Sequence, residues 1–138
     1  MKVLLAVLVT ALLASCASTR LPEATRLALV EAHAGEPVNQ IRYSNPMGWS
    51  RVDGQHVLLD MRPRETWLLT LTGGCLDWGS SSPGLLVKSH TGFSLGKFDS
   101  VQTVDSPVTC RIDEIRPVDM KAVRAAEKQL RDQAPSGT

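Results

Sequence analysis

Three cysteines carry the most specific chemistry in this sequence: Cys16, Cys75 and Cys110. Cys16 directly follows an apolar N-terminal stretch, whereas Cys75 and Cys110 lie 35 positions apart (110 − 75) in the mixed remainder of the chain. A thiol can be acylated, oxidised to a disulfide or bound to a metal, depending on its surroundings. The different surroundings predict different fates for Cys16 and for the other two.

The first 15 residues have the layout of an export signal. Lys2 supplies the positive charge, residues 3–13 are apolar except for Thr10, and two small residues, Ala14 and Ser15, precede Cys16. Charge, apolar run and small-residue cleavage site, in that order, are typical of a secretory signal peptide. The run is shorter than the roughly 20 residues that span a membrane. We therefore expect residues 1–15 to be cleaved.

The segment Leu13-Ala14-Ser15-Cys16 resembles the bacterial lipoprotein box. The resemblance implies that diacylglycerol is attached to the Cys16 thiol and that the chain is cut just before it. Each buried CH₂ of an acyl chain then contributes about 0.8 kcal/mol to membrane anchoring. Ala17 after the cysteine implies the outer membrane, facing the periplasm. The alternative is an ordinary cleaved signal that happens to contain a cysteine.

Export places Cys75 and Cys110 in an oxidising compartment, which favours a disulfide between them. Closing that loop stabilises a fold by roughly 3–4 kcal/mol in the chain-entropy treatment. The alternatives are a metal pair and a catalytic thiol, but neither cysteine has a second Cys or a His at ligand spacing. The three histidines, His33, His56 and His90, are also far apart, so we predict no metal and no cofactor.

Two other polar patterns suggest a site less strongly. Residues 80–82 are three serines, but the chain has no Gly-x-Ser-x-Gly elbow, so a polar loop is the favoured interpretation. Asp99 and Arg116 lie beside apolar positions. They form either a functional polar site or, as we favour, a structural ion pair that ties the sheet to the entry of a helix.

Charge argues against nucleic acid as a partner. The chain has 15 basic and 14 acidic residues, and removal of Lys2 with the signal makes the two numbers equal. Without a basic excess, electrostatic capture of a polyanion is not expected.

The residue pattern predicts two helices around a set of short strands. The expected helices are 23–34 and 120–131, the second capped by Asp119 and carrying a Glu127–Arg131 pair. The expected strands are 38–43, 49–52, 55–61, 65–72, 85–90, 97–104 and 108–115, with a hairpin at Asp53-Gly54. Residues 92–96 are expected to turn, and Pro117 to end the last strand. Residues 65–72 alternate, with Thr66, Leu68, Thr70 and Thr72 on an expected solvated face.

Strands separated by turns predict an α+β fold with a small antiparallel sheet, curled into a barrel-like or sandwich core and flanked by an N-terminal and a C-terminal helix. We expect a signal peptide at 1–15, a lipid-anchored tether at 16–21, one globular domain at 22–132 and a flexible tail at 133–138.

Several segments resemble a family of small, uncharacterised bacterial lipoproteins that is defined only as a domain of unknown function. They are Ala-Gly-Glu-Pro-Val at 34–38, Trp-Leu-Leu-Thr-Leu at 67–71, Phe-Asp-Ser-Val at 98–101, Cys-Arg-Ile at 110–112 and Ile-Arg-Pro-Val-Asp at 115–119. The resemblance implies one exported domain with two paired cysteines, and no activity.

Together these features favour a non-enzymatic binding or accessory module of the cell envelope. It would be held to the membrane through the lipid on Cys16 and would contact an envelope protein or a cell-wall component. A small periplasmic hydrolase is the alternative. A binding module is expected to expose an apolar or aromatic patch, for which Trp49 and Trp78 are the candidates.

Overall fold

The computed structural model of the protein describes residues 20–74, 76–77 and 82–134. Its elements are α2 (Glu23–Ala32), β1 (Gln40–Arg42), β2 (Gly48–Arg51), β3 (His56–Arg62), β4 (Glu65–Thr72), β5 (Leu85–Lys88), β6 (Ser94–Gly96), β7 (Ser100–Thr103), β8 (Thr109–Val118) and α3 (Met120–Gln133). In this part of the chain no helix is long and apolar enough to cross a membrane.

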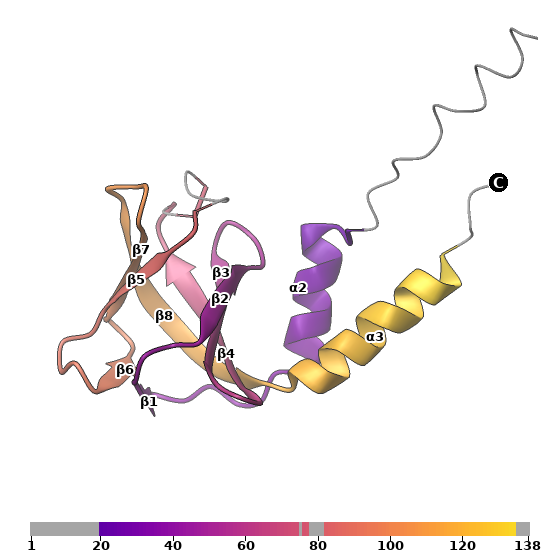
Figure 1. Ribbon diagram of the computed structural model, residues 1–138, viewed down its shortest axis with the longest axis horizontal. Coiled ribbons are helices and arrows are strands. Elements are labelled where there is room, and N and C mark those ends of the chain that lie inside the picture. The colour runs from indigo at the N-terminus through magenta and orange to yellow at the C-terminus, as the bar shows by residue number, and fades with distance from the viewer. Residues whose placement is uncertain (1–19, 75, 78–81, 135–138) are drawn as a thin grey trace, which may run out of the picture.

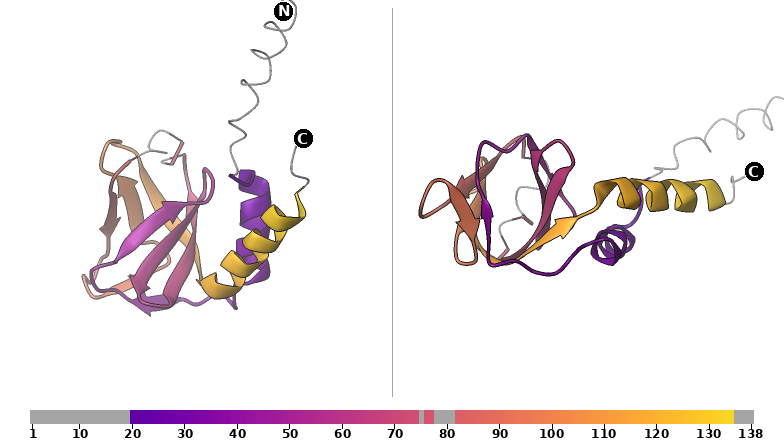
Figure 2. Two further views of the ribbon diagram at one scale, coloured as in Figure 1. Left: turned by 45° about the vertical axis from the view of Figure 1, so that its right-hand side comes forward. Right: turned by 90° about the horizontal axis from the view of Figure 1, so that it is seen from below.

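Six strands form one antiparallel sheet in the order β2-β3-β4-β8-β7-β5, and β1 pairs with β6 in a separate two-stranded sheet. The large sheet curls strongly into a half-barrel, and α2 and α3 lie together beside it (Figure 1 and Figure 2). The predicted α+β class with a curled antiparallel sheet and two flanking helices is therefore confirmed.

Strand β4 is covered on both of its faces. Leu69 points into the half-barrel and belongs to the larger apolar core. On the opposite face, Leu68 and its cross-strand partner Leu58 pack in a second cluster with Val30 of α2 and Val123 of α3. The sheet therefore separates two cores, one inside the half-barrel and one beneath the helices.

This second core corrects one expectation about β4. The strand alternates as predicted, but the face of Thr66 and Leu68 is not solvated: these residues are 8% and 2% exposed. The helices cover this end of the strand, whereas Thr72 at the other end is exposed. An alternating strand shows which residues share a face but does not show whether a helix covers that face.

Strand β8 continues past Pro117, which was expected to end it. Pro117 still pairs in register with Trp67 of β4. On the other side of β8, the carbonyl oxygens of Ile115 and Pro117 accept hydrogen bonds from the amides of Val38 and Gly35, at 2.9 and 2.8 Å. The amide hydrogen that proline lacks would point to that outer side, so the ladder with β4 is intact.

The expected turn at 92–96 is also wrong in part, because Ser94–Gly96 forms β6. Leu95 of β6 pairs opposite Ile41 of β1. Both side chains are buried in the larger core, at 0% and 6% exposure. The short β1–β6 sheet therefore covers one opening of the half-barrel. Ser94–Gly96 contains only one large apolar residue, Leu95, which was too weak a signal to predict a strand.

The second helix begins as predicted, since Asp119 caps it by accepting a hydrogen bond from the amide of Ala122 at 3.1 Å. The expected Glu127–Arg131 pair is wrong. Glu127 instead lies 4.0 Å from the guanidinium of Arg26 on α2, so its carboxylate joins the two helices.

Candidate functional site

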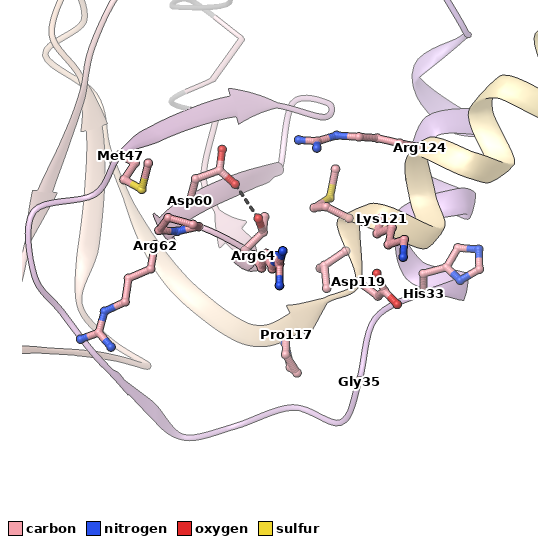
Figure 3. A pocket seen from close by; sticks show the side chains of 14 residues that line it. His33, Gly35, Met47, Asp60, Arg62, Arg64, Pro117, Asp119, Lys121 and Arg124 are labelled. Carbon is pink, nitrogen blue, oxygen red and sulfur yellow. Dashed lines mark hydrogen bonds between the residues drawn. The ribbon is translucent and has the colours of Figure 1, made fainter.

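A groove lies where the tip of the β3–β4 hairpin approaches the start of α3. Its volume is about 970 Å³, and Figure 3 shows its side chains. We call it the basic groove. The residues that line it are His33, Gly35, Met47, Asp60, Arg62, Pro63, Arg64, Thr66, Pro117, Val118, Asp119, Met120, Lys121 and Arg124.

The two carboxylates of the basic groove are used by the fold itself. Asp60 accepts a hydrogen bond from the Thr66 hydroxyl at 2.5 Å, drawn as the dashed line in Figure 3. Asp119 is the cap of α3 and accepts the Ala122 amide hydrogen. Each acid thus has a donor from the protein.

The cations of the groove are not matched in the same way. Arg62 lies 3.7 Å from Glu65. Within the described part of the chain, Arg64, Lys121 and Arg124 have neither an ion pair nor a hydrogen-bond acceptor, and all three are exposed. Figure 3 shows Arg124 extending from α3 toward the strand that carries Asp60. The groove therefore has three positive side chains whose donors are open to a ligand.

Arg64 reaches the groove from an unusual backbone position. Its φ is +68°, in the left-handed region that glycine and asparagine favour. The residue before it is Pro63, so the pair forms the tip of the hairpin between β3 and β4. A side chain other than glycine costs roughly 1–2 kcal/mol in this conformation. The fold thus tolerates some strain at the position that presents Arg64.

Apolar side chains form the rest of the wall. Met47, Pro63, Pro117 and Met120 all line the groove, and Met47 is 66% exposed. Methionine adapts its shape to different partners more readily than branched side chains do. The arrangement suits a ligand that combines a negative group with an apolar part.

The structure places the two predicted polar residues, Asp99 and Arg116, apart from one another, so the expected ion pair is wrong. Arg116 points to the helix side of β8 and donates from Nε to the carbonyl of Gly35 at 2.8 Å and from a terminal nitrogen to Ala34 at 3.4 Å. Arg116 thus ties the sheet to the end of the first helix, and not to the entry of a helix as expected, and it does so through backbone carbonyls.

Asp99 is instead the centre of a tight turn before β7. Its carboxylate, in a residue only 6% exposed, accepts the amide hydrogens of His90 at 3.0 Å and Gly96 at 2.8 Å, and it also contacts the His90 ring. Burial alone would raise the pKa of Asp99, but these hydrogen bonds outweigh it and hold the pKa below the usual value. The predicted site residue is thus a self-contained structural group.

A second Asp–His pair closes the β2–β3 hairpin. Asp53 accepts from the His56 ring at 2.8 Å and from the Gln55 amide at 2.7 Å. Burial opposes ionisation, but the hydrogen bonds and the imidazole lower the pKa of Asp53 overall. In the described ranges no serine hydroxyl is hydrogen bonded to His56 or His90, and the Ser82 hydroxyl donates to Gly84. The hydrolase alternative stays a prediction.

Several predicted residues lie outside the described residues: Cys16, Cys75, Trp78 and the serines 80–81. The lipidation of Cys16 and the Cys75–Cys110 disulfide therefore stay predictions. Cys110 itself is fully buried in the larger core.

Trp49 is half-buried and packs against the core of the half-barrel, so it does not form the expected exposed patch. In the portion of the chain that is described, no group of three His, Cys, Asp or Glu side chains is placed to hold a metal ion.

We did not predict the basic groove from the sequence. Its cations come from two segments, the hairpin tip at Arg64 and the first two turns of α3 at Lys121 and Arg124, which are about 60 residues apart in sequence. The one available signal was Arg62-Pro63-Arg64, two cations on either side of a turn-forming proline.

Comparison with known proteins gives a family and no activity. No curated protein and no solved structure matches the chain. One protein-family model matches it over residues 1–134, nearly its full length. The curled sheet, its two helices and the basic groove are thus features of a member of the family of unknown function DUF6491, to which this chain belongs.

Proposed function

We propose that this protein is a lipid-anchored binding module of the bacterial cell envelope, and that its basic groove binds an anionic envelope component. The anchoring part rests on the sequence of residues 1–16, where an export signal ends at a cysteine in a lipoprotein-box context. The binding part rests on the groove.

The observation that carries the binding proposal is that the carboxylates of the groove have partners within the fold, whereas three of its cations do not. Both carboxylates are engaged by donors of the fold, at Thr66 and at the Ala122 amide. Arg64, Lys121 and Arg124 have no acceptor among the described residues. An anion seated between them would gain charge-assisted hydrogen bonds that water only partly replaces.

Size and lining narrow the ligand further. A volume of about 970 Å³ lies within the range of sites that enclose small molecules or a short peptide segment. Met47 and Met120 offer apolar contact beside the cations. We therefore expect a carboxylate or phosphate group carried on an apolar scaffold.

The binding test uses the full-length protein in a mild detergent and hexyl phosphate as the probe, with hexanol as the uncharged comparison. Isothermal titration should show binding of hexyl phosphate and none of hexanol. The double variant Arg64→Gln/Arg124→Gln should lose tenfold or more in affinity, because each charged hydrogen bond contributes about 1.5 kcal/mol or more.

The matched control is Arg42→Gln/Lys88→Gln, which removes two exposed cations outside the groove. It should bind hexyl phosphate like the wild type. Equal affinity for hexanol and hexyl phosphate, or an equal loss in both double variants, would contradict the groove. The anchor has a separate test: the intact mass of the mature protein should correspond to a chain that begins at an acylated Cys16.

A further inference from the structure

Helix α3 carries a stripe of basic residues along one face. Lys121, Arg124, Lys128 and Arg131 follow one another at spacings of three, four and three. Residues at these spacings lie above one another on a helix surface. All four are exposed. The first two also line the basic groove, whereas Lys128 and Arg131 lie beyond it.

The second half of α3 has no partner in the described structure. Val123 is buried in the cluster beneath the helices, but every residue from 128 to 134 is exposed. Figure 1 shows this end of the helix extending away from the half-barrel, and the right-hand view of Figure 2, seen from below, agrees. Fold stability therefore does not require the basic residues at this end.

The acidic residues near the stripe do not neutralise most of its positive charge. Glu127 faces Arg26 of α2 at 4.0 Å. Asp132 pairs with Lys128 at 2.6 Å, but both are exposed, and such surface pairs exchange easily with other partners. Arg131 has no ion pair with any described residue. The stripe thus keeps a net positive face.

The anchor would lie near the same end of the molecule. The chain enters the domain at the start of α2, and Figure 1 and the left view of Figure 2 place that point on the same side as the C-terminal end of α3. Six peptide units separate Cys16 from Pro22, and they can span at most about 20 Å. A lipid on Cys16 would therefore keep this end of the domain close to a bilayer.

We infer that the basic stripe of α3 contacts anionic phospholipid headgroups of the membrane in which the anchor is inserted, and so sets the orientation of the domain. This inference rests on the proposed lipid anchoring. Each Lys or Arg near an anionic surface contributes about a fivefold preference for it, and the attraction fades within roughly 8 Å in physiological salt. A tether of at most about 20 Å allows Lys128 and Arg131 to approach the bilayer within this range.

The test is hydrogen–deuterium exchange of the mature lipidated protein in two kinds of vesicle: phosphatidylcholine alone, and a 7:3 mixture with phosphatidylglycerol. Amides of residues 128–134 should exchange at least threefold more slowly in the anionic vesicles, and the difference should disappear in 0.5 M salt. Lys128→Glu/Arg131→Glu should abolish the difference. Lys88→Glu/Lys97→Glu, which makes the same change in net charge at exposed positions outside α3, should retain it.

The outcomes separate the two claims. If the wild type stays with both kinds of vesicle and shows equal exchange in each, the anchor holds and the stripe inference is overturned. The inference is also overturned if the two double variants behave alike. If the protein stays with neither kind of vesicle, the anchoring itself fails, and the stripe inference fails with it.

Discussion

The turn around Asp99 and the basic groove differ in whether their charged side chains have partners within the fold. Asp99 is 6% exposed and accepts from two backbone amides and one imidazole. In the groove, Arg64, Lys121 and Arg124 are exposed and have no acceptor among the described residues. One region satisfies its charge internally, and the other leaves its charge open to solvent.

The difference shows how to separate a structural charge from a binding charge. A charge removed from water must be matched within the fold, because an unmatched buried ion is costly. A charge that stays in water has no such requirement. When several unmatched charges of one sign line a concave wall, they are available to a ligand. Residue type alone would have ranked Asp99 and the arginines equally.

The largest effect should come from removing the buried carboxylate. Asp99→Ala leaves the amides of His90 and Gly96 without their acceptor and should lower the free energy of unfolding by about 1–3 kcal/mol. Urea unfolding measures this change. His90→Gln is the control, because the His90 side chain is 77% exposed and its contact should contribute little. An equal loss in the two variants would mean that the imidazole, and not burial, makes the turn important.

Lowering the pH should remove the contribution of the same carboxylate to stability, with a smaller effect than the substitution. Its folded-state pKa is lowered, so its contribution is fully present above the unfolded-state value of about 3.9 and is lost as pH falls through the folded value. Stability of the wild type should therefore fall below about pH 4. Asp99→Asn should be less stable at pH 6 and show a shallower fall, with Asp53 supplying part of the remaining slope. Parallel pH curves for the two proteins would refute this assignment.

The smallest effect on stability should come from the groove. Arg124→Gln should change the free energy of unfolding by less than about 0.5 kcal/mol. Arg64→Gly should raise it by roughly 0.5–1 kcal/mol, because glycine relieves the left-handed backbone at φ +68°. Both should still weaken hexyl phosphate binding. A large destabilisation by either variant would show that the groove cations support the fold, and the contrast with Asp99 would be lost.

The sequence predicted most elements of the fold because their signals are local. Asp53-Gly54 marks the hairpin that the structure contains, Asp119 caps the helix that follows it, and β4 has the predicted limits, Glu65–Thr72. The errors arose where contacts with segments distant in the sequence determine the secondary structure. Pro117 stays within β8 because its outer side faces Gly35 and Val38. Ser94–Gly96 becomes a strand because β1 lies beside it.

The site could be predicted less well than the fold. Asp99 and Arg116 were singled out from their neighbours in sequence, and both turned out to have partners within the fold. The groove depends on how the β3–β4 hairpin meets α3, which is a matter of tertiary packing. The cation at Arg64 also lies at a position whose positive φ the sequence does not show.

The central place of β8 has a consequence for how the chain folds. Strands β5 and β7 join the rest of the large sheet only through β8, and Arg116 on that strand helps to hold the end of the first helix. Pairings between segments this far apart form late and slowly. In a chain that crosses a membrane from its N-terminus, β2, β3 and β4 could therefore pair as they emerge, but β5 and β7 could join them in one sheet only after residues 109–118 have followed.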